Sequence, residues 1–107
     1  MSSWLPGILR RVRALAAARR VLFTLKARRE LAGLELGLDT QDACELLVGL
    51  TSEDSAGRLR SMDTGEWLYV FKPTLEGTVL YLKLILRVDC LVVSFHEDDG
   101  DHEQEDS

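Results

Sequence analysis

Long hydrophobic runs are missing from this chain: its longest apolar stretches are about five residues, against the roughly 20 that a membrane-spanning helix needs. Arginines interrupt the N-terminal segment, so we expect no secretory signal peptide and a cytoplasmic protein. Cysteine is scarce as well. Cys44 and Cys90 lack a C-x-x-C partner and are too few for a disulfide scaffold or a structural zinc site, so we interpret both as small buried hydrophobic residues.

The common catalytic signatures are also missing. The sequence contains no G-x-S-x-G, no P-loop, no H-E-x-x-H and no Rossmann glycine pattern, which removes the enzyme classes that depend on them. A metal cluster could be imagined from His96, Asp98, Asp99 and His102. These residues lie where a predicted strand runs into an acidic segment without other structure, so we expect no metal and no cofactor.

What is present is the composition of one globular domain, with 46% apolar and 29% charged residues in 107 positions. The net charge of -5 hides a strong segregation. Residues 1–30 hold eight Arg or Lys and one acid, whereas residues 96–107 hold seven acids and no Lys or Arg. We expect a single domain over residues 1–97 and a disordered acidic tail over residues 98–107. Without that tail the body is slightly basic, so an anionic partner is not excluded.

Helical periodicity dominates the first half of the chain. A helix begins at residue 5 and carries apolar positions through Ala16, and its arginines fall on other faces. Such a helix could lie on a membrane, but docking on the domain core is the favoured interpretation. A short β-prone run at 21–23 ends at Thr24, a plausible N-cap. Two more helices are predicted, at residues 25–36 before Gly37 and at residues 41–48 after a cap by Asp39 or Thr40.

The second half changes to strand periodicity. Strands are predicted at residues 66–72, 78–87 and 90–96, with a weaker candidate at 59–63. Alternation gives each strand two faces, and one face is entirely apolar. The apolar face holds Trp67, Tyr69, Phe71, Leu80, Leu82, Leu84, Leu86, Leu91, Val93 and Phe95. The other face holds Leu68, Val70, Lys72, Tyr81, Lys83, Ile85, Arg87, Val92, Ser94 and His96. We therefore predict an α+β fold with N-terminal helices packed on one face of a C-terminal antiparallel sheet.

Loop lengths suggest a register for that sheet. A two-residue turn at 88–89 sets Tyr81 opposite His96 and Lys83 opposite Ser94, and a four-residue turn at 74–77 sets Lys83 opposite Leu68. A phenol, an ammonium and an imidazole then share one face with a guanidinium, that of Arg87. Such a face suits an anionic substrate and proton transfer at a phosphodiester, although an ordinary solvated sheet face is an equal alternative.

A set of short motifs lies in a fixed order along residues 12–97. They are Gly37-Leu38-Asp39, Cys44, Gly49-Leu50 before an acidic turn ending at Asp54, Ser61-Met62, Trp67, Val70, Pro73, Tyr81-Leu82-Lys83, Asp89 and Leu91-Val92-Val93-Ser94-Phe95. With these motifs the chain resembles the MqsR family of bacterial toxins. The resemblance implies a RelE-like microbial ribonuclease architecture and a metal-independent endoribonuclease, an mRNA interferase that cleaves mRNA and inhibits translation and growth. It also implies a cognate antitoxin, MqsA-like, with a zinc-binding domain and a helix-turn-helix domain through which alone DNA would be contacted.

The family's active positions carry over unevenly. Its tyrosine is Tyr81, its lysine before Ser-Met is Arg60, its C-terminal lysine is His96, and its glutamine is Leu68. By this resemblance we expect His96, Tyr81 and Arg60 to be catalytic. A histidine can be acid or base near neutral pH, and an arginine can grip phosphate in bidentate fashion. Phosphate-binding roles are expected for Lys83, Arg87 and Lys72.

Two alternatives stay open at this point. The apolar Leu68 would permit a protein that has lost turnover and acts by binding an antitoxin and regulating its operon. The acidic tail after His96 could fold over the cationic face and compete with RNA, although a tail that only aids solubility is the favoured interpretation.

Overall fold

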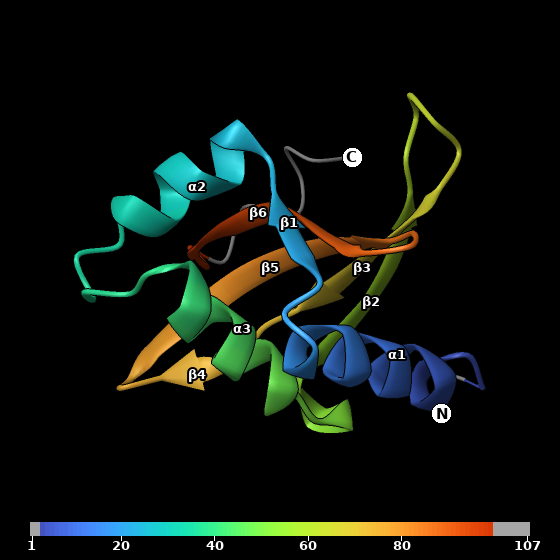
Figure 1. The fold of residues 1–107 in the computed structure, drawn as a ribbon, viewed down its shortest axis with the longest axis horizontal. Helices are drawn as coiled ribbons and strands as arrows, with labels where there is room; N and C mark the ends of the chain where they lie inside the picture. Colours follow the sequence, from blue (N-terminus) through green and yellow to red (C-terminus); the bar gives the residue numbers. More distant parts are fainter. Residues whose placement is uncertain (1–2, 100–107) are drawn as a thin grey trace.

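Within residues 3–99, three α-helices come early, and the sheet is built largely from the second half of the chain (Figure 1). The computed structural model describes residues 3–99. The helices are α1 (Leu5–Ala17), α2 (Leu25–Ala32) and α3 (Thr40–Val48), and a 3-10 helix, η1 (Ser52–Asp54), follows them. The strands are β1 (Val21–Phe23), β2 (Ser55–Arg60), β3 (Trp67–Phe71), β4 (Thr74–Leu75), β5 (Thr78–Leu86) and β6 (Cys90–Glu97).

The strands form a mixed sheet in the order β1-β6-β5-β3-β2, and β4 pairs with the start of β5. The predicted α+β architecture, with helices N-terminal and the sheet C-terminal, is confirmed. The predicted antiparallel pairing is confirmed for β2, β3, β5 and β6, but the sheet is mixed, because β1 pairs in parallel with β6, from Val21 opposite Cys90 to Phe23 opposite Val92. A run of three apolar residues contains no signal for the direction in which it will pair.

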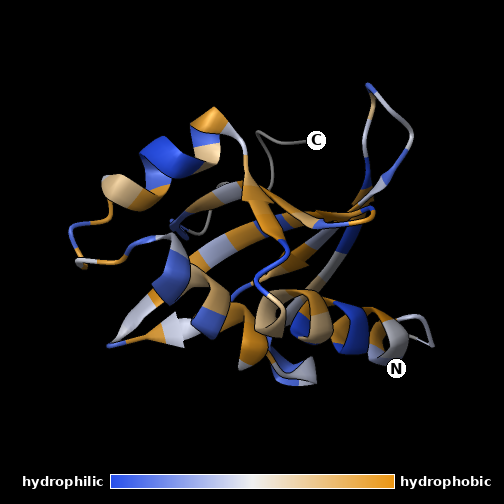
Figure 2. Cartoon of the chain, in the orientation of Figure 1, coloured by the Kyte–Doolittle hydropathy of each residue, from blue (hydrophilic) through white to orange (hydrophobic). Residues whose placement is uncertain are grey.

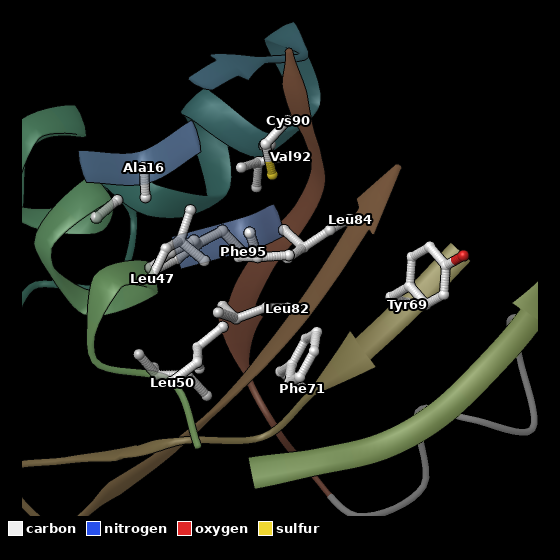
Figure 3. Packing of buried hydrophobic residues seen from close by; sticks show 14 of the residues in the cluster. Ala16, Leu47, Leu50, Tyr69, Phe71, Leu82, Leu84, Cys90, Val92 and Phe95 are labelled. Atoms are coloured by element: carbon white, nitrogen blue, oxygen red, sulfur yellow. The ribbon is translucent and has the colours of Figure 1, made fainter. Parts of the chain in front are cut away.

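Helices α1 and α3 pack together against one face of the sheet and enclose the core (Figures 1 and 3). Phe71 and Phe95 are fully buried there, and each such burial contributes about 1.5–3 kcal/mol. Cys44 and Cys90 are buried and unbridged, as predicted. In Figure 2 hydrophilic residues lie on α2, which packs along β6 and adds Ala27 and Leu31 to the same core. Among residues 3–99 no helix has the length and apolar character to cross a membrane.

The helix ends follow local chemistry. The Thr24 hydroxyl accepts a hydrogen bond from the backbone N–H of Ala27 at 3.0 Å, so it caps α2 as predicted. Asp39 and Asp42 form a reciprocal capping box at the start of α3. The prediction that the second helix continues to residue 36 is wrong, since α2 ends at Ala32 with Gly33 as its cap.

A β-bulge in β6 overturns part of the predicted face assignment. Lys83 pairs with Ser94, but the next residue of β5, Leu84, pairs with Val92, so Val93 is an extra residue in β6. The bulge reverses the alternation before it: Val92 is fully buried in the core, whereas Leu91 and Val93 are only half-buried. The predicted pairs of Tyr81 with His96 and Lys83 with Ser94 are confirmed, but the predicted two-residue turn at 88–89 is wrong. Leu86 pairs with Cys90, so the turn has three residues, and the extra residue of the bulge restores the predicted register beyond it.

The hairpin between β3 and β5 also differs from the prediction. Lys83 lies opposite Val70, not Leu68, because β4 extends the pairing and leaves a turn of only Glu76 and Gly77. Both turn residues have positive φ, 51° and 83°, as a two-residue hairpin turn of this hand requires. The shift moves each partner by two residues and so preserves the faces. The weak strand predicted at 59–63 begins earlier, at Ser55.

Of the predicted acidic tail, residues 98 and 99 are described. Residues 100–107 lie outside the described residues, and so does the predicted disorder there.

Candidate active site

Four predicted residues meet on the sheet face that α1 and α3 leave uncovered. The rings of Tyr81 and His96, cross-strand neighbours on β5 and β6, stack with centroids 5.2 Å apart and planes 9° apart. The Nζ atoms of Lys72 and Lys83 each lie 5.7 Å from the centroid of the Tyr81 ring. We call these residues, Lys72, Tyr81, Lys83 and His96, the Tyr81 cluster.

The Tyr81 cluster is largely withdrawn from water. Tyr81 is fully buried and Lys83 is 8% exposed, while Lys72 and His96 are half-buried. Two ammonium groups near one ring repel each other, and low exposure weakens the screening of their field. An anion placed beside both lysines would relieve that repulsion, so the cluster is chemically suited to a phosphate group.

One hydrogen bond assigns the protons of His96. Its Nδ1 lies 2.9 Å from the backbone oxygen of Glu97. A carbonyl oxygen can only accept, so Nδ1 is the donor and carries the proton. In neutral His96, therefore, Nε2 holds the lone pair, and it is the ring atom able to take up a proton.

The acidic C-terminal segment starts at this cluster. The Asp98 carboxylate lies 3.6 Å from Nζ of Lys72, and the Asp98 N–H donates to the backbone oxygen of Val79 at 2.9 Å. The Asp98 carboxylate thus already occupies one of the positions in which an anion would bind Lys72.

Arg60 lies on the other face of the sheet. It pairs with Trp67, whose side chain shares the face of Tyr69 and Phe71, and its guanidinium stacks on the indole at 3.9 Å from the ring centroid. Arg58 lies over the same ring at 3.8 Å. The structure therefore does not bring Arg60 to the Tyr81 cluster.

Arg87 is also distant from the cluster. It follows Tyr81 by six residues, which at about 3.3 Å per residue places it about 20 Å along the strand direction. Its guanidinium makes a bidentate ion pair with Glu66, at 2.7 and 2.9 Å. Arg87 lowers the pKa of Glu66 to about 2, and Glu66 raises the pKa of Arg87.

Leu68 lies on the cluster's face but adds no polar atom to it. It pairs with Leu59 of β2 and is half-buried. The position at which the resemblance implies a glutamine is therefore part of an apolar strip beside Val70.

A metal site finds no support in the part of the chain from residue 3 to residue 99, where no three His, Cys, Asp or Glu side chains group as ligands. His102 of the imagined cluster lies outside the described residues.

Sequence reasoning missed two residues of α2 that contact the strand carrying His96. Glu30 accepts a hydrogen bond from the backbone N–H of Phe95, and Lys26 Nζ donates to the Ser94 hydroxyl. These contacts join positions 65 and 68 residues apart, so no local sequence signal could have found them.

Known proteins match most of this chain. The sequence profile described as "Motility quorum-sensing regulator, toxin of MqsA" matches residues 7–97. The mRNA interferase toxin MqsR of Escherichia coli (strain K12) is 36% identical over 64 residues. The match covers 59% of this chain and 65% of that protein, which is less than two thirds of its length.

Proposed function

The chain belongs to the family of motility quorum-sensing regulators that are toxins of MqsA, and from this premise we propose that it is an RNA-cleaving toxin. Its substrate is mRNA in the cytoplasm, and its cleavage inhibits translation and growth. The relative's name, mRNA interferase toxin, supports this reaction class. The observation that carries the proposal is the stack of His96 on Tyr81, with the Nζ atoms of Lys72 and Lys83 each 5.7 Å from the centroid of the Tyr81 ring.

In the proposed reaction His96 is the general base. Its Nε2 removes the proton of a ribose 2′-hydroxyl, and the resulting oxygen attacks the adjacent phosphorus. The negative charge that develops on the phosphoryl oxygens is stabilised by the ammonium groups of Lys72 and Lys83. The bond to the 5′-oxygen breaks, and this oxygen takes a proton from the Tyr81 hydroxyl, which regains one from the imidazolium. The products are a 2′,3′-cyclic phosphate and a 5′-hydroxyl, and no step requires a metal ion.

Arg60 and Arg87 have no catalytic or phosphate-binding role in the proposed reaction. Both positions carry charge that could attract RNA at longer range, but neither reaches the phosphate held by the Tyr81 cluster. This assignment replaces the expectation of a catalytic Arg60 and a phosphate-binding Arg87 with the two lysines nearest to Tyr81.

The partner that we propose is a cognate antitoxin of the MqsA kind, because the family description names the chain's relatives as toxins of MqsA. DNA would then be contacted only through that antitoxin. Expression of the chain alone should arrest bacterial growth, and co-expression of the neighbouring antitoxin gene should restore it.

A second candidate function rests on Leu68. Because this apolar side chain lies where the resemblance implies a glutamine, a protein without turnover that binds the antitoxin and regulates its operon is the alternative. It predicts soluble expression without toxicity and a stable complex with the antitoxin.

The deciding experiment incubates purified protein with a defined mRNA in EDTA and maps the new 5′ ends. His96→Ala is the test variant, and His102→Ala is the matched control because it removes the chain's other histidine. We expect discrete cuts with the wild type and the control and none with His96→Ala. Equal cleavage by His96→Ala would contradict the mechanism, and no cleavage by any protein would favour the second candidate.

A further inference from the structure

The outer edge of β6 is covered in two different ways. Along its first part β1 supplies a parallel strand, which ends at Phe23 opposite Val92. The chain then turns into α2, and the last backbone bond of this edge runs from the N–H of Thr24 to the oxygen of Val92 at 3.1 Å. Past this point helix side chains, rather than a strand, bond to β6.

Two side chains of α2 replace the missing strand. Glu30 Oε1 accepts from the Phe95 N–H at 2.9 Å, and Lys26 Nζ donates to Ser94 Oγ at 3.0 Å. Lys26 and Glu30 also pair with each other at 3.0 Å, one helical turn apart. Both oxygens of the Glu30 carboxylate are thus engaged, and its side chain is 22% exposed.

This part of β6 requires such support. The bulge at Val93 interrupts the ladder with β5 immediately before Ser94, and His96 follows two residues later. A bulged strand bends and twists locally, and an unpaired buried N–H costs about 1–3 kcal/mol. Glu30 removes that cost at Phe95, which lies between the two residues of β6 that face the Tyr81 cluster, Ser94 and His96.

We propose that Glu30 is a positioning residue for His96. By accepting the Phe95 N–H it holds β6 in the one arrangement in which the imidazole stacks on Tyr81. Glu30 and His96 line the same surface hollow, so a displacement of the strand would change the space beside the imidazole directly. The role of Glu30 in turnover rests on the proposed function, whereas its role in the ring stack does not.

The positioning role predicts that substitutions of Glu30 differ in effect according to whether they keep an acceptor for the Phe95 N–H. Glu30→Gln keeps one oxygen acceptor at the same reach for the Phe95 N–H, and it loses the charge and the second oxygen, which pairs with Lys26. Because the bond to Phe95 is retained, this variant should preserve the stack and the rate. Glu30→Ala removes the acceptor, and Glu30→Asp shortens its reach by one methylene group, so both should release the Phe95 N–H. Glu45→Ala is the matched control, because Glu45, on α3, is another acid that ion-pairs with a basic side chain, that of Arg19.

The experiment measures RNA cleavage and ring contact side by side. We expect Glu30→Ala and Glu30→Asp to lower kcat about tenfold to hundredfold with little change in KM. Glu30→Gln and Glu45→Ala should stay within about twofold of the wild type. NMR should show faster exchange of the Phe95 amide and weaker Tyr81–His96 ring contacts in the first two variants only.

Several results would overturn the proposal. One is a wild-type kcat in Glu30→Ala although its Phe95 amide exchanges rapidly, and another is a loss of rate in Glu30→Gln equal to that in Glu30→Ala. If Glu30→Ala does not fold, Glu30→Asp against Glu30→Gln gives the same comparison. If the wild type cleaves no RNA, the proposed function fails, and unchanged ring contacts in Glu30→Asp would still refute the positioning role.

Discussion

The imidazole of His96 lies nearly parallel to the ring of Tyr81, with 5.2 Å between the ring centroids. The two residues are direct partners on antiparallel strands, so their contact follows from register and not from a flexible loop. A proton acceptor is thereby held against a phenol in a region of low exposure. The role of the Tyr81 hydroxyl can therefore be tested separately from that of the ring, by a substitution that removes only the hydroxyl.

Tyr81→Phe keeps the ring stack and removes the hydroxyl. If that hydroxyl protonates the leaving 5′-oxygen, kcat should fall by about 10²-fold or more while the melting temperature changes little. Cleavage of a short RNA and thermal unfolding measure the two quantities. Tyr69→Phe is the control, because Tyr69 is 8% exposed and lies on the opposite face of the sheet, where its ring contacts Trp4. A wild-type rate in Tyr81→Phe would remove Tyr81 from the proton transfers.

Truncation after Asp98 tests the acidic tail. The Lys72–Asp98 ion pair places the start of this segment at the Tyr81 cluster, so further acids would compete there with RNA phosphates. We expect the truncated protein to bind a non-cleavable RNA more tightly at about 50 mM salt, with the difference lost near about 0.5 M because of screening. Fluorescence anisotropy measures the affinity. Equal affinity at low salt would leave the tail a role in solubility alone.

The Glu66–Arg87 pair predicts a pH effect on stability. The pKa of Glu66 lies at about 2 in the folded protein against an ordinary 4.5, because Arg87 donates two hydrogen bonds to its carboxylate. The contribution of this ion pair to the free energy of unfolding is therefore present above pH 4.5 and is lost as the pH falls toward 2. Urea unfolding of wild type and Glu66→Gln should show a difference that shrinks over this window. A difference that is independent of pH would contradict the pairing.

Arg87→Gln tests the placement of Arg87 far from the Tyr81 cluster. Since its guanidinium is engaged with Glu66, we expect kcat on a short RNA to stay within about twofold of the wild type, as surface substitutions away from such a site usually allow. Lys83→Met is the matched comparison and should reduce the rate strongly. A comparable loss in both variants would restore the phosphate-binding role that the sequence suggested for Arg87.

The Cys90 thiol should be unreactive in the folded protein. Burial raises its pKa to about 12, and burial also raises the pKa of Cys44. Only the thiolate is nucleophilic, so iodoacetamide at about pH 8 should modify neither residue until the chain is unfolded. Mass spectrometry with and without denaturant counts the modified thiols. Rapid modification of Cys90 under native conditions would show that β6 opens easily.

Much of the candidate site was predictable from the second half of the sequence. Side chains alternate along a strand, so Tyr81 and His96 could be placed on one face. Their direct pairing agrees with the prediction because the bulge at Val93 offsets a turn that is one residue longer than predicted. A change of two residues in a turn length, as between β3 and β5, leaves such faces intact. The placement of Arg60 across the sheet from Tyr81 was consistent with the same alternation.

Other features could not be predicted, because they depend on contacts between distant segments. The bulge at Val93 reverses the faces of Leu91 and Val92, although the local alternation contains no break there. The parallel pairing of β1 was equally hidden in a run of three residues.

The sequence by itself determined that this protein has an apolar and a polar sheet face and that Tyr81 and His96 share the polar one, because periodicity along a strand is a local property. Only the tertiary structure decided which charges stand beside them. Glu30 reaches Phe95 across 65 residues of chain, and Arg87 pairs with Glu66 across 21. Such pairings depend on how helices and strands pack in three dimensions, which the spacing of residues along the chain does not encode.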